Sequence, residues 1–472
     1  MSDYNFLMEI RLSPPQFQVL NHVSRASASA GINLYLVGGA VRDLTCGRDQ
    51  IRNLDFAVEG NVQKVLRALE TGGGRKSSAA VSEALHREPT AKIELMQFDS
   101  RRQAASLIFA QGVQVDITQT HRETHSHPGR APEISPAGIF EDLRRRDFSA
   151  NAMAVSLHPN SRGLLLDPTN GAADIEQREF RALDSHGFIS DPSRIYRLLR
   201  LSERLGFKVE QRTQDWLNAA LQARAWESMS PEQQGRELRA LLQEENPTRV
   251  LRLFAHHGLL AGLDRSLAAG RIPYDRLDKV RSIVRSVPGA DPFMVQFQAL
   301  IEKFSPAHRK RLAQKIVTDA KTLRTALNLE AEARSLVKPL ASSKMSAPSA
   351  VYKFLYDKPQ SLLLYVLAHT PQAKIQTRVK NFLFKVPQIR AKLPRAELQA
   401  LGVEPGPQAE EALNQIFLLI LDGKVKTQLQ ITKALREMLG LGSEPSHKSA
   451  SPAPAPPSDE KRRALGKRSF QH

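Results

Sequence analysis

Residues 36–43 read LVGGAVRD, and this stretch indicates the fold more clearly than its neighbours do. The apolar run INLYLV, which ends inside it, predicts a short buried strand, and the residues after the glycines predict a helix. Without Cβ atoms, Gly38 and Gly39 let backbone N–H groups approach a bound anion closely. Arg42 is able to donate two parallel hydrogen bonds to phosphate oxygens, and Asp43 is placed to orient it. A tight turn without a ligand explains the two glycines equally well.

A second predicted strand, LDFAV at 54–58, carries Asp55. Alternate residues of a strand face the same side, so residue 53 lies on the same face as Asp55. Two carboxylates at this spacing are able to share two Mg²⁺ ions, which position a triphosphate and an attacking hydroxyl group. Here Asn53 is not a carboxylate, and Asp116 in a later predicted strand, VQVDI, is a third candidate. Taken alone, either aspartate is more typical of a strand-end cap or a surface charge.

The order of predicted elements divides the chain. Strand and helix patterns mix over residues 1–180, including a strand at 91–98, which predicts an α/β or α+β domain. Helical patterns then continue to residue 442 and predict stacked helices. Residues 443–472 are rich in Ser, Pro and Ala and are expected to be disordered. The segment TGGGRKSSA at 71–79 predicts a mobile loop.

The composition restricts the class of protein. Lys and Arg total 67 and Asp and Glu total 49, so the formal net charge of +18 favours a polyanionic partner. Cys46 is the only cysteine, which excludes an intrachain disulfide and a thiolate metal cluster and is typical of a reducing cytoplasm. No uninterrupted apolar stretch approaches the about 18–20 residues of a membrane span, and the N-terminus lacks the pattern of a secretory signal.

Longer motifs follow in order along the chain. They are DLRRRDFSANAMA at 142–154, DPTNG at 167–171, SDPSRIYRLLRLSERLGF at 190–207, EQQGREL at 232–238 and EPGPQAEEALNQIFLLILDGKVKTQ at 404–428. With LVGGAVRD and NLDFAVEG, they resemble the motifs of the bacterial tRNA nucleotidyltransferases that add CCA to tRNA 3′ ends. That class also includes the bacterial poly(A) polymerases. The resemblance extends over roughly residues 33–440.

The resemblance implies an α+β fold. It predicts a nucleotidyltransferase (polymerase-β-like) head with a mixed sheet over residues 1–180, followed by an all-helical remainder. Within that remainder, a neck over 181–262 is expected to select the base and bind RNA, and a body and tail over 263–442 to bind tRNA. The implied activity is template-independent addition of CCA, or part of it, to tRNA from CTP and ATP with Mg²⁺. A cytoplasmic protein without membrane contact is expected, and the oligomeric state stays open.

Two alternatives stay open at this point. One is a poly(A) polymerase, because the head motifs of the two enzymes look the same. The other is a catalytically weakened relative that binds tRNA or nucleotide without transferring it, because Asn53 occupies the position of the family's first metal-binding aspartate.

The resemblance also implies roles for individual residues. Asp55 and Asp116 are expected to hold Mg²⁺ and to form the catalytic centre together with Asn53. The residues expected to bind the nucleotide are Gly38, Gly39, Arg42, Asp43, Arg146, Asp147, Asp191, Arg194 and Arg197.

Asp191 and Arg194 are expected to read the base. They are three residues apart at the start of a predicted helix and therefore lie on one face. An aspartate accepts from an exocyclic amine, which cytosine and adenine both carry, and an arginine donates to ring nitrogen or carbonyl groups. Outside this motif, an ordinary i,i+3 ion pair would be the better interpretation. Of the run Arg144, Arg145 and Arg146, we expect at least one side chain to point into the cleft.

Several positions depart from the family pattern. Asn53 offers Mg²⁺ a neutral oxygen, so metal binding is expected to be weaker. Asp49 is a possible replacement carboxylate, although it belongs to the turn and not to the strand. Ser190, Gln233 and His121 are milder departures.

A basic window at 371–395 contains no acidic residue and interleaves Phe382 and Phe384 with its charges. Neutralising RNA phosphates releases counterions, so such a window is typical of RNA binding, although solvated helix faces and core phenylalanines are the alternative. The residues predicted to contact tRNA are Lys374, Arg378, Lys380, Lys385, Arg390 and Lys392. A second basic cluster lies at 303–315.

Overall fold

The computed structural model describes residues 3–49, 51–71, 92–110, 112–124, 132–269, 272–287, 289–317, 320–403 and 406–440. The chain forms two compact units, Met1–Leu336 with Pro359–Thr370 and Val337–Lys358 with Pro371–His472. The predicted tail at 443–472 and nearly all of the predicted loop at 71–79 lie outside the described residues.

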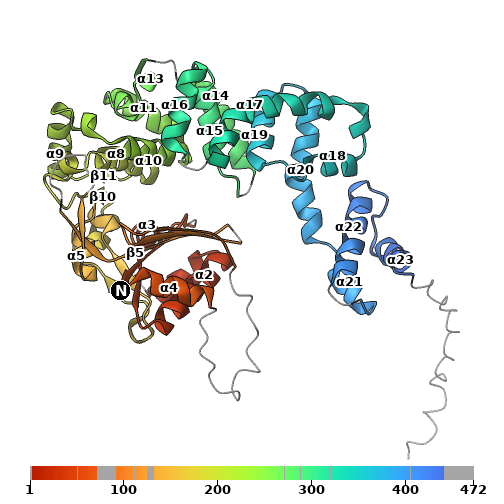
Figure 1. Ribbon diagram of the computed structural model, residues 1–472, viewed down its shortest axis with the longest axis horizontal. Coiled ribbons are helices and arrows are strands. Elements are labelled where there is room, and N and C mark those ends of the chain that lie inside the picture. The colour runs from red at the N-terminus through yellow and green to blue at the C-terminus, as the bar shows by residue number, and fades with distance from the viewer. Residues whose placement is uncertain are drawn as a thin grey trace, which may run out of the picture. The chain divides into compact units, whose positions relative to one another are not determined.

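A seven-stranded mixed sheet forms the core of the N-terminal part of the first unit (Figure 1). The strand order is β3-β4-β5-β2-β1-β8-β9. The pair β2–β5 is parallel, and β1 is antiparallel to both β2 and β8. The strands are β1 (Asn33–Val37), β2 (Leu54–Glu59), β3 (Ile93–Asp99), β4 (Ala104–Phe109), β5 (Gln114–Gln119), β8 (Ala154–Ser156) and β9 (Leu165–Leu166).

Helices α2 (Pro14–Ser29) and α4 (Val62–Glu70) pack together on one side of this sheet (Figure 1). A Ser–Gln capping box and Pro14 start α2, and α4 buries Val62, Val65, Leu66 and Leu69 along one stripe. The helix α3 (Gly39–Thr45) follows β1 directly, as the glycine pair predicted. Helices α2 and α4 cover one face of the sheet, and the opposite face of β2 and β5 lines the site together with α3 (Figure 1).

All four of the predicted strands named below are present, and the structure contains further strands that were not predicted. The strands predicted at 32–37, 54–58, 91–98 and 113–117 correspond to β1, β2, β3 and β5. Strand β4, with the sequence AASLIF, was not predicted. No glycine or proline marks its start, and its small residues carry a weak strand preference. Further along, β6 (His121–Thr124) pairs with β7 (Glu133–Pro136) outside the main sheet.

Helices dominate the rest of the first unit, which confirms the predicted α+β fold. One short exception is β11 (Lys208–Val209), which pairs with β10 (Glu179–Phe180). The helices are α1 (Tyr4–Arg11), α5 (Ile139–Arg144), α6 (Gly171–Glu176), α7 (Gly187–Ser190), α8 (Ser193–Leu205), α9 (Gln211–Gln222), α10 (Pro231–Leu242), α11 (Pro247–His256), α12 (Leu260–Leu263), α13 (Arg265–Ala269), α14 (Tyr274–Ser286), α15 (Phe293–Ile301), α16 (Pro306–Ile316), most of α17 (Ala320–Ala341) and α19 (Gln360–His369).

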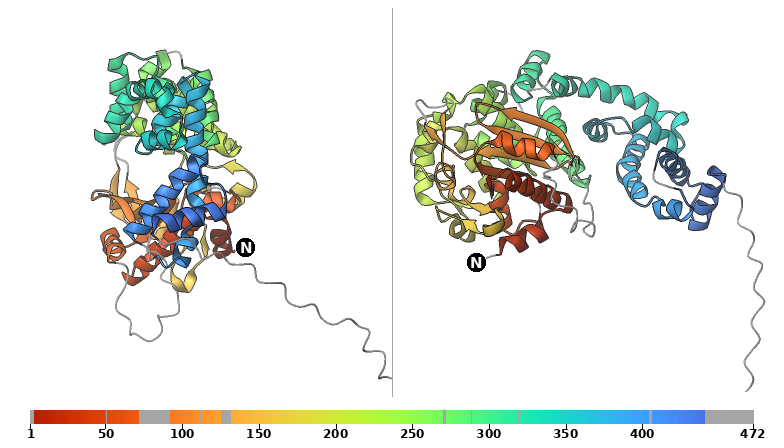
Figure 2. Two further views of the ribbon diagram at one scale, coloured as in Figure 1. Left: turned by 90° about the vertical axis from the view of Figure 1, so that its right-hand side faces the viewer. Right: turned by 60° about the horizontal axis from the view of Figure 1, so that its bottom comes forward.

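The second unit is helical throughout its described part (Figure 2). It contains the end of α17, α18 (Pro348–Leu355), α20 (Ala373–Ala391), α21 (Arg395–Ala400), α22 (Pro407–Leu421) and α23 (Gln428–Met438). Its buried cluster includes Leu398, Leu413, Ile416 and Leu435. No helix of the described residues has the length and apolar character needed to cross a membrane.

Candidate active site

A cleft of about 1550 Å³ in the first unit is lined by the open face of β2 and β5 and by α3, α8, α10 and α14. All of the residues predicted for catalysis and nucleotide binding line it. They are Gly38, Gly39, Arg42, Asp43, Asn53, Asp55, Asp116, Arg146, Asp147, Asp191, Arg194 and Arg197. The structure brings the predicted residues together in one cleft, and their roles in catalysis and binding stay predictions.

Gly38 makes the turn at the base of the cleft. Its φ of +66° belongs to the left-handed region, which L side chains rarely adopt. A Cβ atom there would lie 3.0 Å from Nη1 of Arg146 and 3.7 Å from Oδ2 of Asp55. Gly39 is less constrained, because its nearest neighbour would be Arg42 at 3.5 Å. The turn therefore brings backbone next to a cationic and an anionic side chain at once.

Arg42 is buried and held by two partners. Its Nε donates to Oδ1 of Asp43 at 2.8 Å, so Asp43 orients it as predicted. Its Nη1 donates to Oδ1 of Asn151 at 2.5 Å. Nδ2 of Asn151 donates to Oδ1 of Asp147 at 3.0 Å, and Arg197 donates to the other oxygen of Asp147 at 2.8 Å. Five polar side chains thus form one chain of hydrogen bonds along the wall of the cleft.

Asn151 was not among the predicted site residues. It belongs to the DLRRRDFSANAMA motif, so its position in that motif was the only signal in the sequence. Burial raises the pKa of Asp147, but the charges of Arg197 and Arg194 and the hydrogen bond from Asn151 outweigh it and lower this pKa to about 2. Asp147 is therefore ionised at neutral pH, and its hydrogen bond holds Arg197 in place.

The two carboxylates on the sheet lie side by side. Asp55 and Asp116 are register partners on the parallel strands β2 and β5, and their neighbours along each strand point into the core. Burial and the charge of Asp116 raise the pKa of Asp55 to about 6, although Arg146, Arg197 and Arg42 oppose the shift. The hydroxyl of Ser106 donates to Oδ1 of Asp116 at 2.5 Å.

This pair fits a divalent cation. Two like charges on adjacent strands repel one another, and a bound cation removes that repulsion. The described residues contain no group of three or more His, Cys, Asp or Glu that could hold a metal. Mg²⁺ sites nevertheless need only one or two protein carboxylates when substrate phosphates and water complete the shell.

Asn53 and Asp49 do not add a third carboxylate to this pair. Asn53 precedes β2 by one residue and lines the cleft, where it offers an amide oxygen. Asp49 also lines the cleft, but its side chain is 89% exposed and pairs with Arg11 at 2.5 Å. The structure thus gives Asp49 an ion-pair partner outside the carboxylate pair.

The three consecutive arginines at 144–146 have different surroundings. Arg146 donates to Oδ2 of Asp142 at 2.9 Å, and Arg145 donates to Oδ1 of Asp142 at 2.7 Å and to Glu123 at 2.9 Å. Both line the cleft, whereas Arg144 does not. His121, which departs from the family pattern, lies in the same network, with Nε2 3.1 Å from Glu123.

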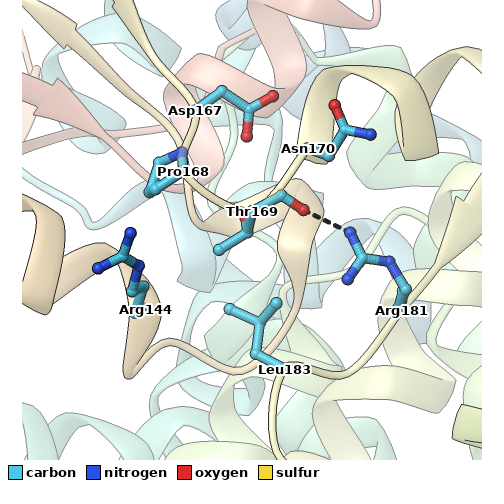
Figure 3. Close-up of a pocket in the computed structure, with 7 residues that line it drawn as sticks. All are labelled: Arg144, Asp167, Pro168, Thr169, Asn170, Arg181 and Leu183. Carbon is cyan, nitrogen blue, oxygen red and sulfur yellow. Dashed lines mark hydrogen bonds between the residues drawn. The ribbon is translucent and has the colours of Figure 1, made fainter.

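Arg144 lines a smaller pocket of about 710 Å³ (Figure 3). The other charged residues of this pocket stabilise the DPTNG segment. Arg181 pairs with Asp174 at 2.8 Å, and Asp167 accepts from the backbone N–H groups of Gly171 and Ala172 at 2.7 and 2.9 Å. The pocket shares none of its lining residues with the cleft, and its polar contacts are explained by local structure.

Asp191 and Arg194, the predicted base-reading pair, lie just before and within the first turn of α8. Nε of Arg194 is 3.8 Å from Oδ2 of Asp191, so the two form a loose ion pair and not a hydrogen bond. Nη2 of Arg194 donates to the backbone carbonyl of Arg145 at 3.1 Å. Arg194 is therefore anchored to the residue that precedes Arg146.

Three of the six predicted tRNA contacts have structural partners in the second unit. Lys374 donates to the carbonyl of Ala341 at 3.0 Å, Arg378 to that of Ser342 at 3.0 Å, and the Arg390 guanidinium lies 5.4 Å from the Tyr352 ring centre. Phe382 packs near Tyr352 as well, at 6.1 Å between ring centres. The other three are exposed, and the described residues supply no partner for their side chains; they are Lys380, Lys385 and Lys392.

Three of the five Lys and Arg residues in the second basic cluster form ion pairs. Arg309 contacts Glu330 at 2.7 Å, and Arg311 and Lys315 both contact Asp264 at 3.2 Å. These contacts favour the interpretation of paired helix faces for this cluster.

Comparison with known proteins agrees with the motifs. Residues 34–181 match the family model described as the Poly A polymerase head domain. This segment is similar to that domain and is named the head domain of this chain for that similarity. It contains the sheet, Asp55, Asp116, the glycine turn and the arginine run. The family resemblance predicted from the motifs is thereby confirmed.

Curated relatives extend the similarity beyond the head domain. The A-adding tRNA nucleotidyltransferase of Halalkalibacterium halodurans is 28% identical over 86% of this chain and 89% of its own length. The CC-adding tRNA nucleotidyltransferase of Deinococcus radiodurans is 28% identical over 91% and 96%. The A-adding enzyme of Geobacter sulfurreducens is 24% identical over 89% of this chain, which spans 47% of that relative's length.

Among solved structures, the CCA-adding enzyme of Thermotoga maritima complexed with tRNA is 22% identical. The match covers 93% of this chain and 99% of that one, with a TM-score of 0.45.

Proposed function

We propose that this protein is a tRNA nucleotidyltransferase that adds CCA, or part of it, to tRNA 3′ ends from CTP and ATP. The observation that carries the proposal is one cleft that combines a registered carboxylate pair, an arginine-rich phosphate grip and an Asp–Arg pair at a helix start. The names of the full-length relatives support a tRNA substrate over poly(A) synthesis. We further infer a cytoplasmic location, where tRNA and nucleoside triphosphates are present.

Each part of the cleft has a separate task in this proposal. Arg42 and Arg146 bind the triphosphate, and the Asp43–Arg42–Asn151 contacts keep Arg42 in place before the substrate arrives. Asp191 and Arg194 bind the base. Asp55 and Asp116 would hold Mg²⁺, which supplies charge neutralisation of the phosphates and activation of the attacking hydroxyl group.

The test uses full-length protein and three tRNA transcripts that lack CCA, lack CA or lack the final A. Each transcript is incubated with Mg²⁺ and labelled CTP or ATP, and the products are separated at single-nucleotide resolution. We expect addition to at least one transcript that stops at a defined length. Asp55→Asn should abolish it, whereas Asp99→Asn, on an exposed strand position, should leave it unchanged.

Two other outcomes point elsewhere. A long ladder made from ATP alone on unrelated RNA would identify a poly(A) polymerase. No addition to any transcript would contradict the proposal. If Asn53→Asp then restores addition, the protein is the catalytically weakened relative. This second candidate is favoured by Asn53, which lines the cleft where the family pattern has an aspartate.

A further inference from the structure

The two oxygens of the Asp191 carboxylate have different surroundings. Oδ1 accepts three hydrogen bonds, from the backbone N–H of Ser193 at 3.2 Å, the Ser193 hydroxyl at 2.6 Å and the side-chain amide of Gln233 at 2.8 Å. Oδ2 lies 3.8 Å from Nε of Arg194, beyond hydrogen-bond distance. The protein thus occupies one oxygen and leaves the other for a ligand in the cleft that Asp191 lines.

The orientation of the Gln233 amide is fixed from its other end. Its Oε1 accepts from the backbone N–H of Ser230 at 2.9 Å, in the capping box that starts α10. A backbone N–H is always a donor, so the oxygen must face Ser230 and the NH₂ group must face Asp191. Gln233 is 9% exposed, so water competes little for this contact.

We propose that Gln233 is a positioning residue for base selection, a role that rests on the proposed function. By donating to Oδ1, Gln233 holds the Asp191 carboxylate so that Oδ2 remains an acceptor toward the base. Cytosine and adenine present an exocyclic amine to such an acceptor, whereas uracil and guanine present a keto oxygen at the corresponding position. Oδ2 and a keto oxygen are both acceptors, so neither has a hydrogen-bond donor when uracil or guanine occupies the site. Binding of UTP and GTP is therefore disfavoured.

The neutral amide suits this task. A cation at position 233 would form an ion pair with Asp191 and reduce the negative charge that remains for the amine. The amide donates one hydrogen bond and leaves the full charge of the carboxylate shared between Oδ1 and Oδ2. Removal of the amide leaves only the two hydrogen bonds from Ser193, so Oδ1 is then held from one side and the carboxylate is less firmly oriented.

The test measures binding, so it does not depend on nucleotide transfer. Equilibrium dialysis with Mg²⁺ gives dissociation constants for CTP, UTP, ATP and GTP on the full-length protein. We expect the unaltered protein to prefer CTP over UTP and ATP over GTP. Gln233→Leu should reduce both preferences by about tenfold, the size expected for a lost hydrogen bond to a charged group. Gln233→Glu keeps an acceptor for the Ser230 N–H but replaces the NH₂ group that donates to Asp191. It should therefore also reduce both nucleotide preferences.

Ser230→Ala is the matched control. It removes the serine end of the same capping box and leaves the Gln233–Asp191 contact, so it should lower the melting temperature and keep the preference. Unchanged preference in both Gln233 variants, equal loss in Ser230→Ala, or no preference in the unaltered protein would overturn the inference. If the preference responds as expected and no nucleotide is transferred to tRNA, the proposed function fails and the role of Gln233 stands.

Discussion

Gly38 shows how one backbone conformation brings the parts of the site together. Its positive φ turns the chain between β1 and α3, and its missing Cβ leaves room for the guanidinium of Arg146. The local backbone conformation and the position of Arg146, which is predicted to bind the triphosphate, therefore both depend on Gly38.

Gly38→Ala should therefore impair both stability and nucleotide binding. The left-handed conformation costs an alanine about 1–2 kcal/mol, and the contact with Arg146 displaces that side chain. Urea unfolding should show the lower stability, and titration with ATP should show weaker binding. Gly258→Ala is the control, because its φ of +70° is also positive but a Cβ there would meet nothing within 4 Å, so it should lower stability and leave nucleotide binding unchanged. Equal effects of the two variants would contradict this interpretation.

The buried charge of Asp147 predicts a specific pH dependence of stability. Its pKa is about 2 in the folded protein, against an ordinary value of 3.8. The group therefore stabilises the fold above about pH 4, and this contribution is lost as the pH falls toward 2. Asp147→Asn should be less stable at neutral pH and should lose less free energy of unfolding between pH 4 and 2. The exposed Asp357→Asn should leave the slope unchanged; a slope unaltered in Asp147→Asn would contradict the prediction.

At the scale of elements, α20 combines two kinds of basic residue. Lys374 and Arg378 donate to carbonyl groups near the C-terminal end of α17, where such groups have no intrahelical partner. Lys380 and Lys385 are exposed. Helix α20 thus carries two kinds of basic side chain. Some bind carbonyl groups at the end of α17, and others are exposed and available to a polyanion.

Variants on α20 should separate these two roles. Arg378→Ala should lower the free energy of unfolding by about 1 kcal/mol through the lost hydrogen bonds. Lys380→Glu with Lys385→Glu should leave stability nearly unchanged and weaken tRNA binding. The slope of log affinity against log salt should become shallower by about two if each lysine meets one phosphate. Filter binding over a salt series and thermal unfolding measure both; unchanged affinity in the double variant would exclude these lysines as RNA contacts.

At the scale of the first unit, a buried charge network joins the head domain to the helices that follow it. Glu244, with a side chain 2% exposed, lies 2.8 Å from Arg200 and 2.9 Å from Arg52, which precedes β2. Arg204 lies 3.9 Å from Glu244 and 3.7 Å from Asp43, the residue that orients Arg42. Arg42, which is predicted to bind phosphate, and α8, which carries the predicted base-reading Arg194, are therefore supported by the same charge network.

Glu244→Gln should destabilise the unit by about 3 kcal/mol, because three arginines lose their shared buried anion. Denaturant unfolding followed by tryptophan fluorescence measures this, since Trp216 and Trp226 both belong to the first unit. Glu245→Gln, at the neighbouring exposed position, should change stability by less than about 0.5 kcal/mol. A small effect of Glu244→Gln would show that solvent, and not the Glu244 carboxylate, compensates the positive charges of these arginines.

The sequence motifs predicted the head-domain fold and twelve of the residues that line the cleft, most of them through the family resemblance. Short-range patterns contributed part of this: apolar runs predict β1, β2 and β5, the glycine pair predicts the turn at position 38, and alternation from residue 53 into β2 predicts that Asn53 and Asp55 face the same side. Each pattern depends only on neighbours along the chain, so it can be recognised without coordinates.

Only the tertiary structure decided which of these residues touch. Asn151 joins Arg42 to Asp147, Gln233 holds Asp191 from a helix about forty residues away, and Arg378 binds carbonyl groups near the end of α17. These contacts join residues far apart in sequence, and their partners are fixed by helix packing and by the need to satisfy buried polar groups. A list of charges in the sequence contains no such information, because it does not distinguish a cation that binds its own backbone from one that is available to a ligand.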